Sequence, residues 1–190
     1  WTQRAKLTAS DGGAEDQFGE LVLRGDTALI GAPGHAGNRG AAYVFVGSGS
    51  SWSEQAKLEA SDGRADDYFG ARVGLDGDRA LIGAFSHDDA GVIESGAAYV
   101  FVRSGTAWSQ EAKLVPSDVA TEDEFGRAVA LAGDTVMVSS FHDDDLGLDS
   151  GSAYVFRRDG STWSEEAKLT SAPNGEADAF GSSVTIAGDL

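Results

Sequence analysis

The sequence repeats one pattern four times, and this repeat limits the possible folds more than any other feature. Each copy starts with W-[ST]-[EQ]-x-A-K-L, continues through an acidic stretch and reaches a Phe-Gly pair. The copies begin at Trp1, Trp52, Trp108 and Trp163, which places them 51, 56 and 55 residues apart. A unit of this length cannot bury its own apolar face, so it is stabilised by stacking on its neighbours, as in solenoids and propellers.

Each unit contains four short runs with β character, separated by turn residues. In the second unit they cover residues 69–75, 80–84, 97–102 and 108–114. The two middle runs are almost entirely apolar, which is typical of strands covered on both faces. The last run alternates apolar and polar residues, which is typical of an outer strand with one exposed face. No window has a helical period, so we predict an all-β fold of four-stranded antiparallel propeller blades.

The repeat boundaries predict one partial β-propeller over residues 1–190. We expect complete blades at about 18–58, 69–114 and 125–169. An outer strand at 1–7 and an inner strand at 180–190 are expected to belong to neighbouring blades. Because propellers close with roughly 4 to 8 blades, further blades of the same protein are expected to complete the ring.

The composition is strongly acidic. There are 31 Asp and Glu residues against 14 Lys and Arg, which gives a net charge of −17. Such a field repels phosphate backbones and anionic lipids, so nucleic acid is not expected as a partner, whereas cations and basic surfaces are. The same acidity also fits simple solubility in a saline environment. No long apolar run is present, so no membrane insertion is expected.

The Phe-Gly pairs, together with Gly31-Ala32-Pro33 at the end of a second strand, resemble the FG-GAP repeat. This repeat forms the blades of the integrin alpha-subunit propeller and of many bacterial surface and secreted proteins. The resemblance covers essentially the whole chain and is strongest to the bacterial variety. It implies a non-enzymatic, secreted or cell-surface module that binds a protein or carbohydrate ligand or mediates adhesion. A structural spacer beside a catalytic domain and a sugar-binding propeller are the alternatives.

Residues that recur in every unit are expected to build the blade. The third strands carry aromatic pairs that should pack within or between blades: Tyr43 and Phe45, Tyr99 and Phe101, Tyr154 and Phe156. Arg24-Gly25-Asp26 spells an integrin-binding tripeptide. The equivalent slots in the other units keep only Gly-Asp, so we interpret it as a turn.

The loop after the second strand differs between units, and a binding site is therefore expected there. Asp143, Asp145 and Asp149 follow the pattern D-x-D-x-G-x-D, and the preceding unit carries Asp88, Asp89 and Glu94. Alternating carboxylates around a flexible backbone supply the oxygen ligands that Ca²⁺ prefers, so these six residues are the candidate metal ligands. A solvated acidic loop is the alternative. The calcium motif of integrin-like repeats, D-x-D-x-D-G between the first and second strands, has no matching positions here.

Catalytic patterns are sparse. The three histidines, His35, His87 and His142, each fall in one of these loops, and no nucleophile or phosphate-binding motif accompanies them. The acidic loops and the segments that cross between units should emerge on one face. We therefore expect that face to bind the ligand and the protein not to be an enzyme.

Overall fold

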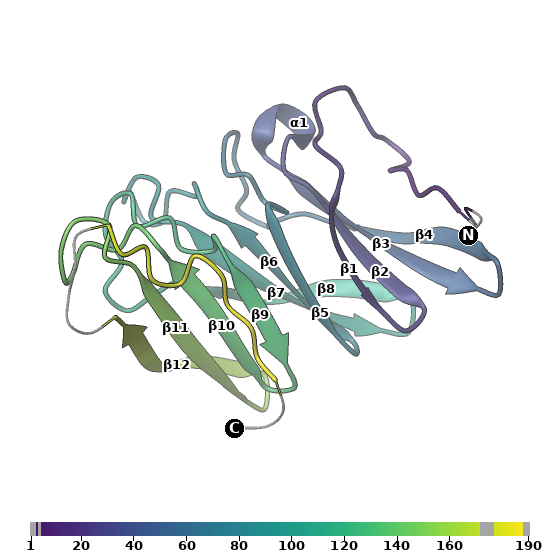
Figure 1. The fold of residues 1–190 in the computed structure, drawn as a ribbon. Coiled ribbons are helices and arrows are strands. Elements are labelled where there is room, and N and C mark those ends of the chain that lie inside the picture. Colours follow the sequence, from purple (N-terminus) through teal and green to yellow (C-terminus); the bar gives the residue numbers. More distant parts are fainter. Residues whose placement is uncertain (1–2, 4, 172–176, 188–190) are drawn as a thin grey trace.

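The computed structural model describes residues 3, 5–171 and 177–187 of the chain. The chain forms three separate four-stranded antiparallel sheets, one after another in the sequence, and they lie next to one another in space (Figure 1). Blade 1 contains β1 (Glu20–Arg24), β2 (Thr27–Ala32), β3 (Ala41–Ser48) and β4 (Ser51–Leu58). Blade 2 contains β5 (Arg72–Asp76), β6 (Arg79–Ala84), β7 (Ala97–Ser104) and β8 (Ala107–Leu114). Blade 3 contains β9 (Val129–Ala132), β10 (Thr135–Ser140), β11 (Ser152–Asp159) and β12 (Thr162–Thr170).

These sheets confirm the predicted all-β architecture. Strands follow one another in space in chain order within each sheet, so each blade is a simple up-and-down meander. The only helix within the described ranges is α1 (His35–Asn38), which contains non-helical backbone at Ala36 and Gly37. No helix in this described part of the chain is long and apolar enough to cross a membrane.

Two-residue turns connect the first and second strands of each blade. In blade 2 the turn is Gly77-Asp78, between β5 and β6. Gly77 has a φ of 54°. Two-residue hairpin turns whose twist matches the strands need positive φ, which glycine adopts without a steric penalty. The Gly-Asp slot, including Arg24-Gly25-Asp26, is thus part of the blade architecture, and the fourth copy at Asp189 lies outside the described residues.

Glycine also sets the distance between blades. Gly83 of β6 lies against the first residues of blade 3, where a Cβ would come within 2.1 Å of the carbonyl oxygen of Gly126. The equivalent Gly31 faces the carbonyl of Gly70 at 1.9 Å by the same measure. The first glycine of the GAP triplet and the glycine of the following Phe-Gly pair therefore permit backbone contact between adjacent blades.

The hydrophobic core extends across the interfaces between blades: one buried cluster joins residues of β2, β3 and β4 to residues of β6 and β7. Phe69 is fully buried and packs edge-to-face against Tyr99 and Phe101, with ring centroids 5.5 and 6.0 Å apart. Phe125 repeats this geometry in blade 3 with Tyr154. All six third-strand aromatics are buried, as predicted. Burial on both faces explains why the middle strands are apolar along their whole length.

The two ends of the three-blade stack expose positions that its internal interfaces bury. Leu58 and Leu114, at the ends of β4 and β8, are 2% and 3% exposed, whereas the equivalent Leu169 of β12 is 40% exposed. Leu75 of β5 is 2% exposed, whereas the equivalent Leu23 of β1 is 52% exposed. The sheets do not close into a ring, and both end faces have the composition of an unfinished blade interface.

The flanking segments differ from the prediction. The described residues of the expected outer strand 1–7 and inner strand 180–190 form no strand. A β-strand is defined by hydrogen bonds to a neighbouring strand, and the neighbours of these two segments would be middle strands of further blades. Residues 184–186 nevertheless lie beside β9, where an inner strand belongs, as the trace in Figure 1 shows.

Candidate functional site

The loops that differ between blades all lie at one end of the sheets, which we call the loop face. It comprises the second-to-third-strand loops 33–40, 85–96 and 141–151 and the segments 59–71 and 115–128 that cross to the next blade (Figure 1). Backbone hydrogen bonds join these loops: Asp66 donates to Gly37, Glu122 to Ile93 and Ala177 to Leu148. Each loop is therefore fixed to the crossing segment of the following blade.

A lysine from the outer strand lies at the centre of a polar cluster in each blade. In blade 2 the ammonium of Lys113 donates to Asp62 at 2.8 Å and to Asp89 at 2.5 Å, and lies 2.9 Å from Nε2 of His87. The hydroxyl of Tyr99 donates to the other oxygen of Asp62 at 2.8 Å. Burial alone would lower the pKa of Lys113, but hydrogen bonds to the two carboxylates raise it.

The buried His87 connects this lysine to a second carboxylate. Its Nδ1 lies 2.9 Å from Asp67, and its Nε2 faces the ammonium of Lys113. Because an ammonium can only donate, Nε2 is the acceptor and Nδ1–H donates to Asp67. The same contacts recur in blade 1 among Lys57, Asp11, His35, Asp16 and Tyr43. Both ring nitrogens of each histidine are engaged, so neither imidazole is free for proton transfer.

Blade 3 replaces the histidine with a carboxylate. Asp143 occupies the position of His87, three residues beyond the end of the second strand. The ammonium of Lys168 lies 2.7 Å from Asp118, 2.8 Å from Asp143 and 2.6 Å from Asp145. Burial opposes the charged form of Lys168, but these three bonds outweigh it and raise its pKa.

Because Asp143 replaces the histidine, Asp123 has no imidazole partner, whereas the equivalent Asp67 in blade 2 bonds to His87. Asp123 is buried, and the backbone N–H of Ala120 donates to it at 2.8 Å. Burial, reinforced by the negative charge of Asp143, raises the pKa of Asp123 to about 6. Blade 3 thus holds a buried carboxyl group that takes up a proton more readily than an ordinary aspartate.

The structure brings together only part of the predicted calcium set. Among the residues it describes, one group of three acidic side chains has ligand atoms within 4.8 Å of one another: Asp118, Asp143 and Asp145. Asp118, from the crossing segment, was not among the predicted ligands. The three carboxylates surround the ammonium of Lys168. These oxygens therefore already bind one cation, the charged end of this lysine.

The remaining predicted ligands lie elsewhere. Asp149 lies 3.7 Å from Nδ1 of His142, and its backbone N–H donates to Asp144. In blade 2, Asp88 accepts the backbone N–H of Glu94, and Asp89 binds Lys113. Asp88, Asp89 and Glu94 therefore do not converge on one point.

The opposite end of the sheets, which we call the turn face, has a different charge balance. Two of its aspartates pair with arginines: Arg103 binds Asp78 at 2.7 Å, and Arg79 and Arg158 lie 3.3 and 3.4 Å from Asp134. The others at this end, Asp26, Asp76 and Asp159, form no ion pair with a described residue. On the loop face, several exposed carboxylates form no ion pair with any described residue. They are Glu15, Asp66, Glu94, Glu122 and Asp144. The surplus negative charge is therefore concentrated on the loop face.

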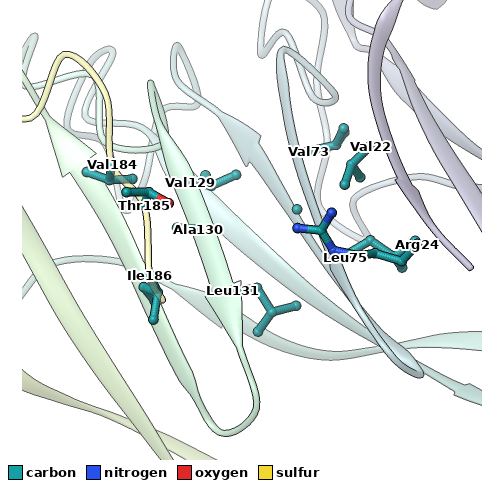
Figure 2. Close-up of a pocket in the computed structure, with 11 residues that line it drawn as sticks. Val22, Arg24, Val73, Leu75, Val129, Ala130, Leu131, Val184, Thr185 and Ile186 are labelled. Carbon is teal, nitrogen blue, oxygen red and sulfur yellow. The ribbon is translucent and has the colours of Figure 1, made fainter. Parts of the chain in front are cut away.

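The inner strands line a small cavity, and most of the residues around it are aliphatic. Its volume is about 160 Å³, and it is formed by β1, β5, β9 and residues 184–186. Figure 2 shows Val22, Val73, Leu131, Arg24 and Leu75 among the residues that line it. Its lining includes no carboxylate or histidine. The acidic loop face is consequently the better candidate site.

The packed sheets define the chain as consecutive blades of the β-propeller type, not closed into a ring. The family model described as FG-GAP repeat matches residues 1–45, 52–101 and 108–156. The chain therefore belongs to the FG-GAP repeat family, which confirms the resemblance seen in the sequence. No curated protein matches the sequence.

Proposed function

We propose that this chain is a non-enzymatic binding module of a secreted or cell-surface protein, and that its loop face binds a partner protein with a basic surface. The observation that carries the proposal is the charge difference between the two ends of the blades. On the turn face, arginines pair with Asp78 and Asp134. On the loop face, Asp66, Glu94 and Asp144 are exposed without an ion pair among the described residues, and Glu15 and Glu122 are too. Unpaired surface charge of one sign steers and orients oppositely charged partners.

Membership of the FG-GAP family supports the module and its extracellular location, since these repeats are typically extracellular and non-catalytic. The engaged ring nitrogens of His35 and His87 also support a binding role, because a general base needs a free nitrogen or oxygen within reach of a substrate. In this proposal the lysine clusters are structural and hold the loops in place.

Calcium assistance is a separate hypothesis that concerns blade 3. Asp143 and Asp145 would hold the ion together with Asp118, and the ion would have to displace the ammonium of Lys168. Hard oxygen donors of this kind suit Ca²⁺. Carbohydrate binding has no comparable support.

The test of the charge proposal compares two variants of equal net charge. The loop-face variant carries Glu94→Gln and Asp144→Asn, and the turn-face control carries Asp26→Asn and Asp159→Asn. The probe is a lysine homopeptide, and its dissociation constant is measured by calorimetry over a range of salt concentrations. We expect the loop-face variant alone to weaken binding several-fold and to reduce its salt dependence. Equal weakening by both variants would mean that only net charge matters, and absence of binding would favour the spacer alternative.

A further inference from the structure

Two exposed apolar side chains remain after the open ends of the stack are accounted for. The large apolar residues that are exposed among the described residues are Leu21, Leu23, Ile93, Leu148 and Leu169. Leu21 and Leu23 lie on β1 and Leu169 on β12, at the two end faces, where a further blade would cover them. Ile93 and Leu148 lie instead on the loop face and are 58% and 64% exposed.

Ile93 and Leu148 occupy the same position in successive blades. The carbonyl of each accepts a hydrogen bond from the next crossing segment, at 3.0 Å from Glu122 and at 2.8 Å from Ala177. Each is followed by an acidic residue with positive φ, 47° at Glu94 and 53° at Asp149. In blade 1 the same carbonyl belongs to Gly37. A fixed backbone with an outward aliphatic side chain is therefore a property of blades 2 and 3.

The two loops are also held together through a stacked arginine. The guanidinium of Arg127 lies 4.1 Å from the ring centroid of Phe85, which follows β6, and 5.1 Å from that of Phe141, which follows β10. Tyr68 also stacks on Phe85, with centroids 5.2 Å apart. This stack connects the first residues of both loops, and together with the backbone bonds to the crossing segments it restrains the loops that carry Ile93 and Leu148. Such preorganisation lowers the entropic cost of binding.

Carboxylates surround both positions. Ile93 lines a hollow of about 260 Å³ in blade 2, whose other lining residues include Asp66, Asp88 and Glu94. Leu148 precedes Asp149 and lies in the loop that carries the exposed Asp144. An apolar centre within a charged rim is the usual composition of a protein-binding surface.

We propose that Ile93 and Leu148 are two apolar anchors through which the loop face docks its partner, and that the partner surface carries apolar side chains between lysines or arginines. This proposal rests on the basic-partner function and adds the contact that gives it specificity. Charge attraction from the carboxylates guides the encounter, and burial of the two aliphatic side chains slows dissociation.

The test uses two probe peptides and two variants of the chain. One probe is a soluble peptide of leucine and lysine, and the other is a lysine homopeptide of the same charge. The anchor variant carries Ile93→Ser and Leu148→Ser, and the control carries Leu21→Ser and Leu23→Ser at the open end of the stack. Dissociation constants are measured by calorimetry, and melting temperatures check that the folds are intact. A serine at an exposed loop position leaves the core contacts unchanged, so we expect the anchor variant to melt like the native chain.

We expect the leucine-lysine peptide to bind the native chain more tightly than the homopeptide. The anchor variant should weaken its binding by about tenfold and leave homopeptide binding unchanged, because truncating a central apolar contact at an interface commonly has an effect of this size. If homopeptide binding persists while the anchor variant has no effect on the leucine-lysine peptide, the anchors are refuted and the basic-partner function stands. Loss of binding in the Leu21 and Leu23 control instead would place the peptide on the open end face and also overturn the proposal. Failure of both peptides to bind would refute the proposed function itself.

Discussion

Substituting Gly83 with alanine isolates the backbone contact between blades 2 and 3. A Cβ at this position would lie 2.1 Å from the carbonyl oxygen of Gly126, far inside van der Waals contact. The carbonyl cannot turn away freely, because the Phe125-Gly126 backbone is tied by hydrogen bonds to Ser95 and to Ser139. The added methyl group must therefore push the two blades apart along the whole interface.

The expected cost follows from overpacking, which typically destabilises a core by about 1–3 kcal/mol. A rigid backbone oxygen is a worse neighbour than a flexible side chain, so we expect Gly83→Ala to lie near 3 kcal/mol, at the upper end of this range. For a chain of this size each kcal/mol corresponds to roughly 2–4 °C, so the melting temperature should fall by about 6–12 °C. Thermal and urea unfolding followed by circular dichroism measure both quantities.

Gly74→Ala is the matched control, because it makes the same chemical change in β5. A Cβ at Gly74 would lie 3.6 Å from the nearest side-chain atoms, those of Leu131 and Leu81, which is ordinary contact. Removing the backbone freedom of a glycine from the unfolded chain is expected to be neutral or to stabilise the fold by up to about 1 kcal/mol. If both variants unfold at the same temperature, the close approach of the blades does not limit stability and the reasoning fails.

Three further perturbations test the interior of the blades and the loop face. Phe101→Ala should lower the free energy of unfolding by about 3–5 kcal/mol, measured by urea denaturation, since the ring is buried in a blade interface; a near-native midpoint would contradict that burial. Asp123→Asn should stabilise the fold at pH 7.5 by about 1–3 kcal/mol and have little effect near pH 4. The pKa of Asp123 is raised to about 6 in the folded state, so the stability from its bound proton is present below the unfolded pKa and is lost as pH rises through 6. Asp67→Asn should destabilise at both pH values because His87 donates to that carboxylate, and equal melting shifts for the two variants would refute the distinction. Millimolar calcium should raise the melting temperature of Lys168→Ala more than that of the native chain, because the ion and the ammonium compete for the same oxygens; equal shifts, or a shift that survives Asp145→Ala, would exclude this ion site.

The blade architecture was predictable because its signals are local and repeated. Alternation in the Trp-x-x-x-Ala-Lys-Leu run specifies an outer strand, and the apolar run of β7 specifies a middle strand, from neighbouring residues alone. The flanking strands were not predictable in the same way. The sequence of residues 180–187 matches an inner strand, but strand formation depends on pairing with a neighbouring strand, and no described strand pairs with these residues.

The lysine clusters could be predicted only in part. In the sequence, Lys57, Lys113 and Lys168 recur at one outer-strand position, which by itself indicates side-chain stems over apolar surface and charged ends paired to acids or in water. This recurrence did not identify the partners, because Asp62 lies 51 residues before Lys113 and meets it only when a crossing segment folds over the next blade. The available signal was the joint recurrence in every repeat of this lysine with the third-strand tyrosine and the acidic crossing segment.

Structural residues are distinguished from candidate binding residues more clearly by comparing equivalent positions of the three blades than by counting residue types in a loop. Calcium ligands were predicted from the alternating carboxylates of the loops, yet Asp143 is buried at a structural position that His87 fills in blade 2. Nothing in the sequence distinguishes Ile93 and Leu148, because single aliphatic residues are common in exposed loops. Their exposure has meaning only after the blade register shows that the remaining exposed leucines belong to unfinished interfaces. In a repeat protein, residues that stay exposed when every blade contact has been assigned are therefore the ones to test first for binding.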